Sequence, residues 1–184
     1  MTTWKIDPSH SAINFAVRHL MISKVRGRFT SFSGDAVYDD AAKTWTSAEG
    51  SIDIASVDTH EEKRDAHLKS VDFFDAEKFP KMTFKSKRIE PSGKGHYKVT
   101  GDLTIKGITK PVTLNVVKYG EFNDPNMGHR IGYAAETEIN RKDFGMKFDM
   151  MLDGKFIVSN DIQIHIEGEI VEAKEAETAG SASS

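Results

Sequence analysis

One short stretch of the chain carries the residue types of a hydrolase. Asp7, Ser9 and His10 supply an acid, a hydroxyl and a base within four positions, the groups that make up a catalytic triad. The stretch has no strained Gly-x-Ser-x-Gly elbow and no evident oxyanion loop. It also falls where a turn between two strands is expected, so Asp7 and Ser9 are interpreted as turn-capping residues.

A second group of histidines and carboxylates could bind a metal. The segment 60–64 resembles a zinc-protease helix until its fifth residue, where Arg64 stands in place of the second histidine. His67 lies seven residues after His60, about 10 Å along a helix axis, which is too far for one shared ion. His165 and Glu167 belong to the wet face of a predicted strand. We therefore expect no metal site.

Other cofactor chemistry is also unsupported. The chain has no cysteine, which excludes disulfides, thiolate catalysis and cysteine-based zinc sites. It has neither a Walker-type nor a dinucleotide-binding glycine loop. No cofactor is therefore expected.

The elements that would position any site are strands. Ile13, Phe15 and Val17 share one face of a segment whose other face is polar or small, and alternating isoleucines continue from Ile162 to Ile170. The pattern predicts an all-β, antiparallel fold of eight or nine strands, one of them spanning 28–38. Periodicity alone leaves a barrel and a sandwich open.

One helix is expected over about 59–70. Thr59 and Glu62 have the spacing of a capping box, in which each side chain accepts a hydrogen bond from the backbone amide of the other residue. Such a helix is about 15 Å long and could cap one end of a barrel. On this helix Arg64 is expected to pair with Asp58, Glu61 or Asp65.

Composition favours one domain over 1–172 and a disordered tail over 173–184, where no large apolar residue occurs. The formal net charge of −3 argues against a nucleic-acid partner. No apolar run approaches the roughly 18 residues of a membrane span, and the first residues lack a signal-peptide core. A cytoplasmic location is the expectation.

The predicted inner face is rich in aromatic and flexible side chains, and methionine adapts to irregular apolar shapes. These side chains could fill a core or line a pore for a long ligand. The residues are Phe15, Val17, Phe29, Phe32, Phe84, Leu103, Ile105, Val112, Leu114, Phe144, Met146, Phe148 and Met150.

A series of motifs in a fixed order covers nearly the whole chain. The motifs are Asp7–Ser11, Phe15–Leu20, Val25–Phe29, Ser56–Thr59, Arg64–Leu68, Phe73–Asp75, Gly101–Gly107, Thr109–Val112 and Asn140–Gly145. In these the chain resembles the YceI-like family of lipid-binding proteins. The resemblance implies an extended, lipocalin-like, eight-stranded β-barrel whose apolar pore holds a polyisoprenoid or another long-chain amphiphilic lipid. It also suggests a homodimer.

A phosphorylated head group would need cationic partners, since guanidinium groups bind phosphate oxygens in a bidentate manner. The candidates are Arg18, His19, Arg26, Arg28, Arg64 and Arg141. The leading hypothesis is a non-enzymatic protein that stores, transports or sequesters an isoprenoid lipid. The alternatives are an enzyme acting on such a lipid, with His10, His19 or His67 as acid or base, and a stress-related interaction module.

Overall fold

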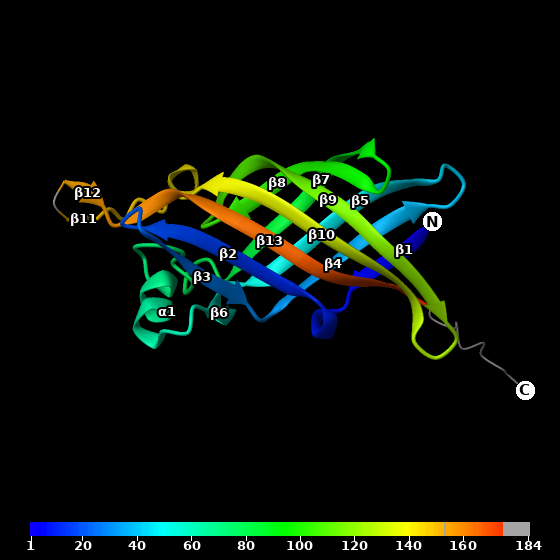
Figure 1. Ribbon diagram of the computed structural model, residues 1–184, viewed down its shortest axis with the longest axis horizontal. Helices are drawn as coiled ribbons and strands as arrows, with labels where there is room; N and C mark the ends of the chain where they lie inside the picture. The colour runs from blue at the N-terminus through cyan, green and yellow to red at the C-terminus, as the bar shows by residue number, and fades with distance from the viewer. Residues whose placement is uncertain (153, 175–184) are drawn as a thin grey trace, which may run out of the picture.

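The computed structural model describes residues 1–152 and 154–174, which form an elongated antiparallel β-barrel (Figure 1). Eight strands are hydrogen-bonded in a closed ring, because the first strand pairs with both the fourth and the last. The expected all-β barrel is confirmed. In order around the ring the strands are β1 (Thr2–Ile6), β4 (Phe32–Asp39), β5 (Thr44–Asp53), β7 (Lys81–Gly93), β8 (His96–Ile105), β9 (Ile108–Asp124), β10 (Gly128–Asn140) and β13 (Val158–Glu172).

Three further strands extend the sheet at one end of the barrel. They are β2 (Ala12–His19), β3 (Ser23–Phe29) and β6 (Val57–Asp58). β13 pairs with β1 near its carboxyl end and with β2 along the rest of its length, so β1 and β2 act as two halves of one strand. A 3-10 turn, η1 (Pro8–His10), separates the halves.

The prediction of one strand over 28–38 is wrong, because β3 and β4 are separate strands. At the break, the Thr30 amide donates to the Ser56 carbonyl, and Ser31 accepts from the Asp53 amide. The first bond leads to the short 3-10 turn η2 (Ile54–Ser56), and the second leads to Asp53, the last residue of β5. The ladder is therefore interrupted and the chain bends.

The helix α1 (Glu62–Lys69) is shorter than expected, and the predicted capping box is wrong. The Glu61 side chain caps it by accepting hydrogen bonds from two amides of the first turn. Thr59 instead donates its hydroxyl to Asp65 at 2.6 Å. His60, between them, has a left-handed backbone with φ of 59°, which places the start of the helix after Glu61.

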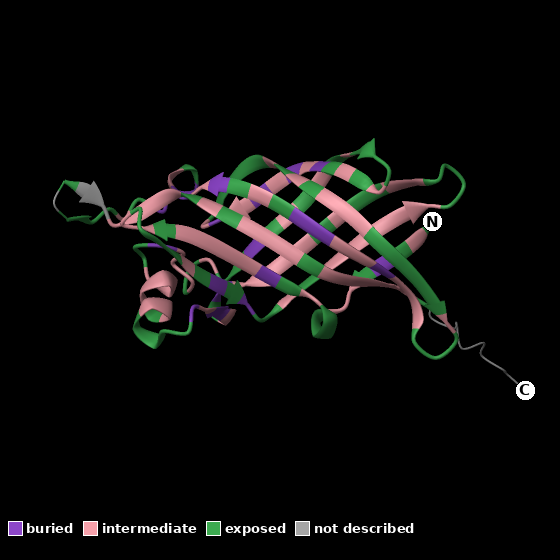
Figure 2. Cartoon of the chain, viewed as in Figure 1, coloured by how far each residue is buried: buried purple, intermediate pink, exposed green. Residues whose placement is uncertain are grey.

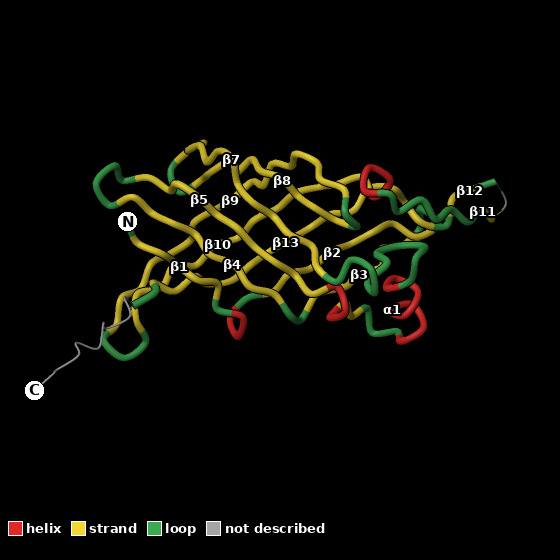
Figure 3. The backbone as a smooth tube through the Cα atoms, turned by 180° about the vertical axis from the view of Figure 1, so that it is seen from behind, coloured by secondary structure: helices red, strands yellow, loops and turns green. Residues whose placement is uncertain are grey.

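α1 lies beside β3 and β6 at one end of the barrel, as Figures 1 and 3 show from opposite sides. We call this the α1 end. Here the sheet stops at β6, and the segment 59–80 occupies the space before β7 begins. The 3-10 turn η3 (Arg141–Phe144) and the small hairpin of β11 (Met151–Leu152) and β12 (Lys155–Phe156) lie at the same end.

Burial follows the strand period. Exposed and less exposed residues alternate along the strands on the outside of the barrel (Figure 2), as expected where one face of a sheet meets water. The core includes Ile54, Ile105 and Phe144, each at most 2% exposed, and Phe73 from the segment after α1. The core therefore joins the helix segment to the strands.

The carboxyl end of β13 is held by the first strand. The Ala173 amide donates to the Thr3 carbonyl at 2.8 Å, so backbone pairing reaches the first residue of the predicted tail. Residues 175–184 of that tail lie outside the described part of the chain. None of the helices among the described residues is long and apolar enough to cross a membrane.

Candidate functional site

A cavity of about 640 Å³ lies inside the barrel, within the range of about 300–1,000 Å³ that is usual for ligand pockets. Every strand of the ring contributes to its wall. Small residues provide part of the space, because Ala36, Ala48, Gly50 and Ala135 stand where larger side chains would project inward. The interior is therefore a ligand-sized space rather than a filled core.

Most of the predicted inner-face residues line this cavity. They are Phe15, Val17, Phe29, Phe84, Leu103, Ile105, Val112, Leu114, Met146, Phe148 and Met150. Phe32 and Phe144 do not line it, which corrects the prediction for these two. Phe144 is 2% exposed and belongs to the core cluster, against which Phe32 also packs.

Tyr133 is a wall residue that the sequence analysis did not select. It lies on β10 with Ile131 and Ala135, which also line the cavity, and the period of two along this strand could have identified it. Its hydroxyl is buried and makes no hydrogen bond of normal geometry. Burial raises the pKa of Tyr133 to about 12, an effect that the nearby Ser11 hydroxyl partly offsets. Tyr133 therefore places a neutral hydroxyl group beside apolar neighbours in the wall.

The candidate head-group residues separate into three groups. Arg18, His19 and Arg64 line the cavity. Arg18 and His19 end β2 and Arg64 belongs to α1, so this group lies at the α1 end. Arg26 and Arg28 are exposed and do not line it, and Arg28 forms an ion pair with Asp58 at 3.0 Å. The structure therefore brings only some of the predicted cations together.

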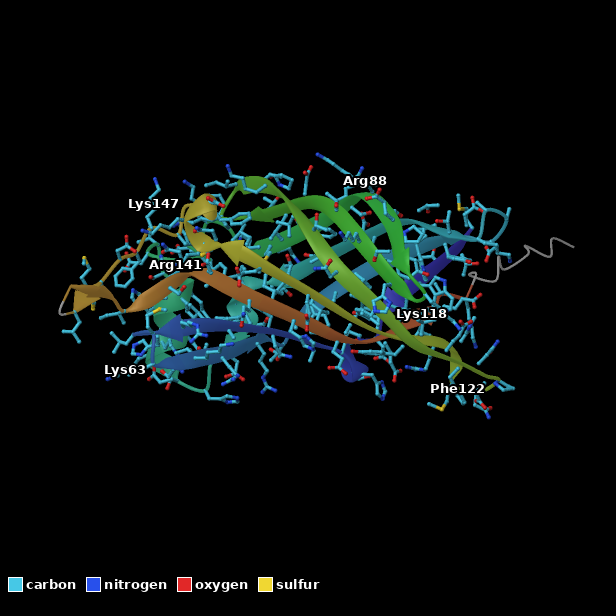
Figure 4. All side chains as sticks on the ribbon, turned by 45° about the horizontal axis from the view of Figure 1, so that its top comes forward. Lys63, Arg88, Lys118, Phe122, Arg141 and Lys147 are labelled. Carbon is cyan, nitrogen blue, oxygen red and sulfur yellow. The ribbon has the colours of Figure 1, made fainter. Side chains whose placement is uncertain are left out.

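Arg141 lines the cavity, but its guanidinium group is bound to acceptors of the protein itself. Its side chain is 2% exposed and points into the α1 end of the barrel (Figure 4). The guanidinium donates to the carbonyls of Ser159, Met146 and Phe148 at 3.1, 2.7 and 2.8 Å, and to Asp149 Oδ1 at 3.0 Å. These bonds hold the segment after η3 against β13, so Arg141 is structural.

The expected ion pair of Arg64 on its own helix is absent. Arg64 Nε donates to Thr59 Oγ1 at 2.8 Å, and one terminal nitrogen donates to the Thr59 carbonyl at 2.7 Å. The Thr59 hydroxyl in turn donates to Asp65. Arg64 is thus fixed by a buried threonine, with part of its guanidinium available to the cavity.

Three further side chains complete the polar part of this end. The side chains of Arg18 and His19 make no hydrogen bond or ion pair within the described part of the chain. His67 also lines the cavity, bonds to Asp72 at 2.9 Å, and packs its ring edge-on against Phe73 and Phe148. The α1 end therefore presents uncommitted donors next to an aromatic wall.

The Asp7 cluster lies outside the cavity. Asp7 caps η1 by accepting from the Ser9 amide at 3.0 Å, as predicted for a turn. Hydrogen bonds from Ser9, Arg130 and His10 hold the pKa of Asp7 well below its usual range. Asp7, His10 and Glu169 are close enough to share a cation. However, Arg130 already binds both carboxylates at 2.7 and 2.8 Å, so the cluster is a salt bridge.

Comparisons with known proteins agree with this architecture. The family model of the YceI-like domain matches residues 4–170. A UPF0312 protein of Vibrio cholerae is 39% identical over 160 residues, which cover 87% of this chain and 82% of that protein. The crystal structure of Burkholderia cenocepacia BcnA superposes with a TM-score of 0.78 at 29% identity, covering 89% of this chain and 98% of that one.

A third match is more distant in sequence. A polyisoprenoid binding domain from Saccharophagus degradans, described as implicated in plant cell wall breakdown, has a TM-score of 0.65 at 16% identity. It covers 92% of this chain and 98% of that one. Its likeness shows the shared fold. By the match along nearly its whole length, the chain belongs to the family of YceI-like domains.

Proposed function

We propose that the protein binds a long-chain isoprenoid or a related amphiphilic lipid, for storage, transport or sequestration. The observation that carries this proposal is the 640 Å³ cavity with its wall of apolar and aromatic side chains. The polyisoprenoid binding domain of Saccharophagus degradans shares the fold, which supports the same ligand class.

The apolar wall supplies affinity for the tail. Burying about ten methylene groups gains roughly 8 kcal/mol before the costs of association. A mainly apolar wall distinguishes ligands by the length and shape of their tails. Any further selectivity must come from contacts with the head group.

The head lies at the α1 end in this proposal. Arg18, His19 and Arg64 line the cavity there and retain donors that the protein does not use. Guanidinium groups suit a phosphorylated head because they donate two parallel hydrogen bonds to its oxygens. The opposite half of the cavity offers Ile6, Ile131 and Ile170 for the end of the tail.

Native mass spectrometry of the gently purified protein tests the proposal. We expect a stoichiometric extra mass that organic solvent extracts as an unaltered lipid. A clean apo mass, with no shift after incubation with polyprenyl phosphates, quinones or fatty amides, would contradict lipid binding. Chemical turnover of the bound lipid would instead support an enzyme.

Substitution tests the head-group assignment separately. Arg18→Gln and Arg64→Gln should weaken binding of a polyprenyl phosphate more than binding of the matching alcohol, by about tenfold for each lost charged hydrogen bond. Arg26→Gln is the matched control, because Arg26 is exposed and lies away from the cavity. Equal losses for the phosphate and the alcohol would contradict a phosphate-binding role.

A further inference from the structure

Two loops at the α1 end carry large apolar side chains into solvent. Met21 and Ile22, in the turn between β2 and β3, are 67% and 82% exposed. Met150, Met151 and Leu152, at and before β11, are each more than half exposed. We call these five residues the apolar tips. Exposed apolar groups gathered at one place mark an interaction surface.

The two loops form one surface because the backbone joins them. The Leu20 amide donates to the Ile157 carbonyl at 2.8 Å, and the Ile157 amide donates to the Met150 carbonyl at 2.9 Å. Figure 1 shows both loops projecting from the same end of the barrel. The apolar tips therefore form one continuous surface.

The turn that presents Met21 is held in an unfavourable backbone conformation. Leu20 and Met21 have φ of 49° and 59°, in the left-handed region where bulky residues are rare. Asparagine and glycine would suit such a turn better. The chain thus keeps an exposed Met21 at a position where folding favours glycine.

The β2–β3 turn is flanked by positive charge, whereas Met150, Met151 and Leu152 are flanked in the sequence by two lysines and by Asp149 and Asp153. No acidic residue occurs from Pro8 through Gly34, while Arg18, Lys24 and Arg26 flank the turn. Within the described residues, Arg18 and Arg26 have no ion-pair partner, and Lys24 bonds only to the neutral Gln163. Lys63 and Lys147 lie at the same end (Figure 4). This charge complements an anionic surface.

The β9–β10 turn at the opposite end of the barrel also has exposed apolar residues, but its own charged residues are acidic. Tyr119, Phe122 and Met127 are each more than half exposed near the β9–β10 turn, and Figure 4 shows Phe122 at that end. The segment 119–128 contains two acidic residues and no lysine or arginine. The nearest cations, Lys118 and Arg130, are ion-paired with Glu121 and with Asp7 and Glu169. This turn therefore lacks the unpaired cations of the β2–β3 turn, which makes it a natural control.

We infer that the apolar tips and their flanking cations dock the α1 end of the barrel onto an anionic lipid bilayer. Arg18 and Met150 are exposed and also line the cavity, so docking brings the cavity wall to the lipid surface. Apolar side chains enter the boundary between head groups and acyl chains, and cations bind the anionic head groups. The passage of a lipid into the cavity rests on the proposed function, but the docking does not.

Sedimentation with vesicles tests the docking. Full-length protein is mixed with vesicles of phosphatidylglycerol and phosphatidylcholine, or of phosphatidylcholine alone, at low and high salt. We expect binding to the anionic vesicles, weaker binding at high salt because ions screen the cations, and little binding to the neutral ones. Wild-type protein that ignores anionic vesicles would overturn the inference.

Matched variants locate the surface. Met21→Gly with Ile22→Ser should fold normally, because glycine suits the left-handed turn, and should lower the partition onto anionic vesicles by about tenfold or more. Tyr119→Ser with Phe122→Ser, at the other end, should leave it within about twofold. Equal losses for both double variants would overturn the assignment of the end. A dimer lost only in the first variant, without vesicle binding by the wild type, would assign the surface to a second copy instead.

Lipid loading separates this inference from the proposed function. Wild type that takes up polyprenyl phosphate from detergent but binds no vesicles would disprove docking and leave the cavity function standing. Wild type that binds vesicles but takes up no lipid would do the reverse.

Discussion

At the scale of single residues, two arginines of the cavity wall differ in what they bind. Arg141 donates to three backbone carbonyls and one carboxylate, all from the protein. Among the described residues, the Arg64 side chain bonds only to Thr59. The sequence alone does not distinguish the two arginines, because every residue has a backbone carbonyl and the residue types therefore do not reveal which carbonyls accept from Arg141. Their different roles follow from the loop that η3 positions around Arg141.

Replacing Arg141 with methionine should destabilise the protein. The change leaves several buried acceptors without a donor, and losing one member of a buried charged network costs about 3–5 kcal/mol. Urea unfolding followed by circular dichroism measures the loss. Arg26→Met is the control, since Arg26 is exposed, and it should change the free energy of unfolding by less than about 0.5 kcal/mol. Similar values for the two variants would contradict the structural role.

His129 is a second residue whose partners determine its behaviour. Its ring lies between Glu172 and Glu121, at 2.8 and 2.6 Å, and meets the Trp4 ring edge-on at 4.7 Å. Burial acts to lower the pKa of His129, but hydrogen bonds to Glu172 and Glu121 outweigh it and raise the pKa above the usual 6.5. The protonated ring thus joins β9, β10 and β13 at the end opposite α1.

The stability contributed by His129 should depend on pH. Because its pKa is higher in the folded state, this contribution is complete below about pH 6.5 and is lost as the pH rises through the folded-state value. His129→Gln should therefore flatten the decline of the free energy of unfolding as the pH rises above about 6.5. His165→Gln is the comparison: the pKa of His165 is also raised, mainly by Glu167, but this side chain is 42% exposed and solvent screens its pairs. If the free energy of unfolding declined with pH as steeply in His129→Gln as in the wild type, His129 would not be the source of this pH dependence.

At the scale of elements, one glycine makes the junction of β1 and β2 possible. A Cβ atom on Gly168 of β13 would lie 2.0 Å from Ser11 Oγ and 2.6 Å from Ser11 Cα. Because backbone as well as side chain lies in the way, the clash cannot be relieved by rotating Ser11. Gly168 therefore lets the chain cross β13 where β1 passes into β2.

Gly168→Ala should cost about 2–3 kcal/mol, as forced overpacking does. Gly120→Ala on β9 is the matched control, because nothing lies within 4 Å of its added Cβ, and it should change stability by less than about 0.5 kcal/mol. Thermal and urea unfolding of both variants measure the difference. Equal stability of the two variants would show that the backbone at Ser11 can shift to accommodate a Cβ atom at position 168.

The period of two predicted β2 and β13 well, since the alternating apolar residues of both strands face the cavity. It could not predict the break at Thr30 and Ser31, because neither is a strong turn former and the cause is the distant η2. The predicted cap of α1 is wrong for a similar reason. Thr59 has the correct spacing from Glu62, but its hydroxyl bonds to Asp65 and Arg64 instead. Local patterns thus predict strand faces, while long-range partners determine where elements begin and end.

At the scale of the whole molecule, the cavity depends on small residues facing inward. Ala48 on β5 lines the cavity beside Ala36 of the neighbouring strand. Ala48→Phe should fill part of the space and lower lipid affinity by more than about tenfold, with the barrel intact by circular dichroism. Native mass spectrometry of lipid occupancy measures the effect.

Ala12→Phe is the control for this variant. Ala12 is exposed and does not line the cavity, so the same added volume stays outside the barrel. We expect full occupancy in this variant. Equal loss of lipid in Ala12→Phe and Ala48→Phe would show that the ligand does not occupy this cavity.

The ring closes through β1 and β13, which pair Trp4 with Glu172. This contact joins the earliest and the latest strands to be synthesised, and such distant pairings form slowly. During translation the wall therefore lacks a strand until β13 has left the ribosome, and the nascent apolar interior stays open to water and to other chains. The cavity wall is complete only once β13 has been made and has paired with β1, so binding of the proposed lipid should follow the synthesis of β13 rather than accompany that of the earlier strands.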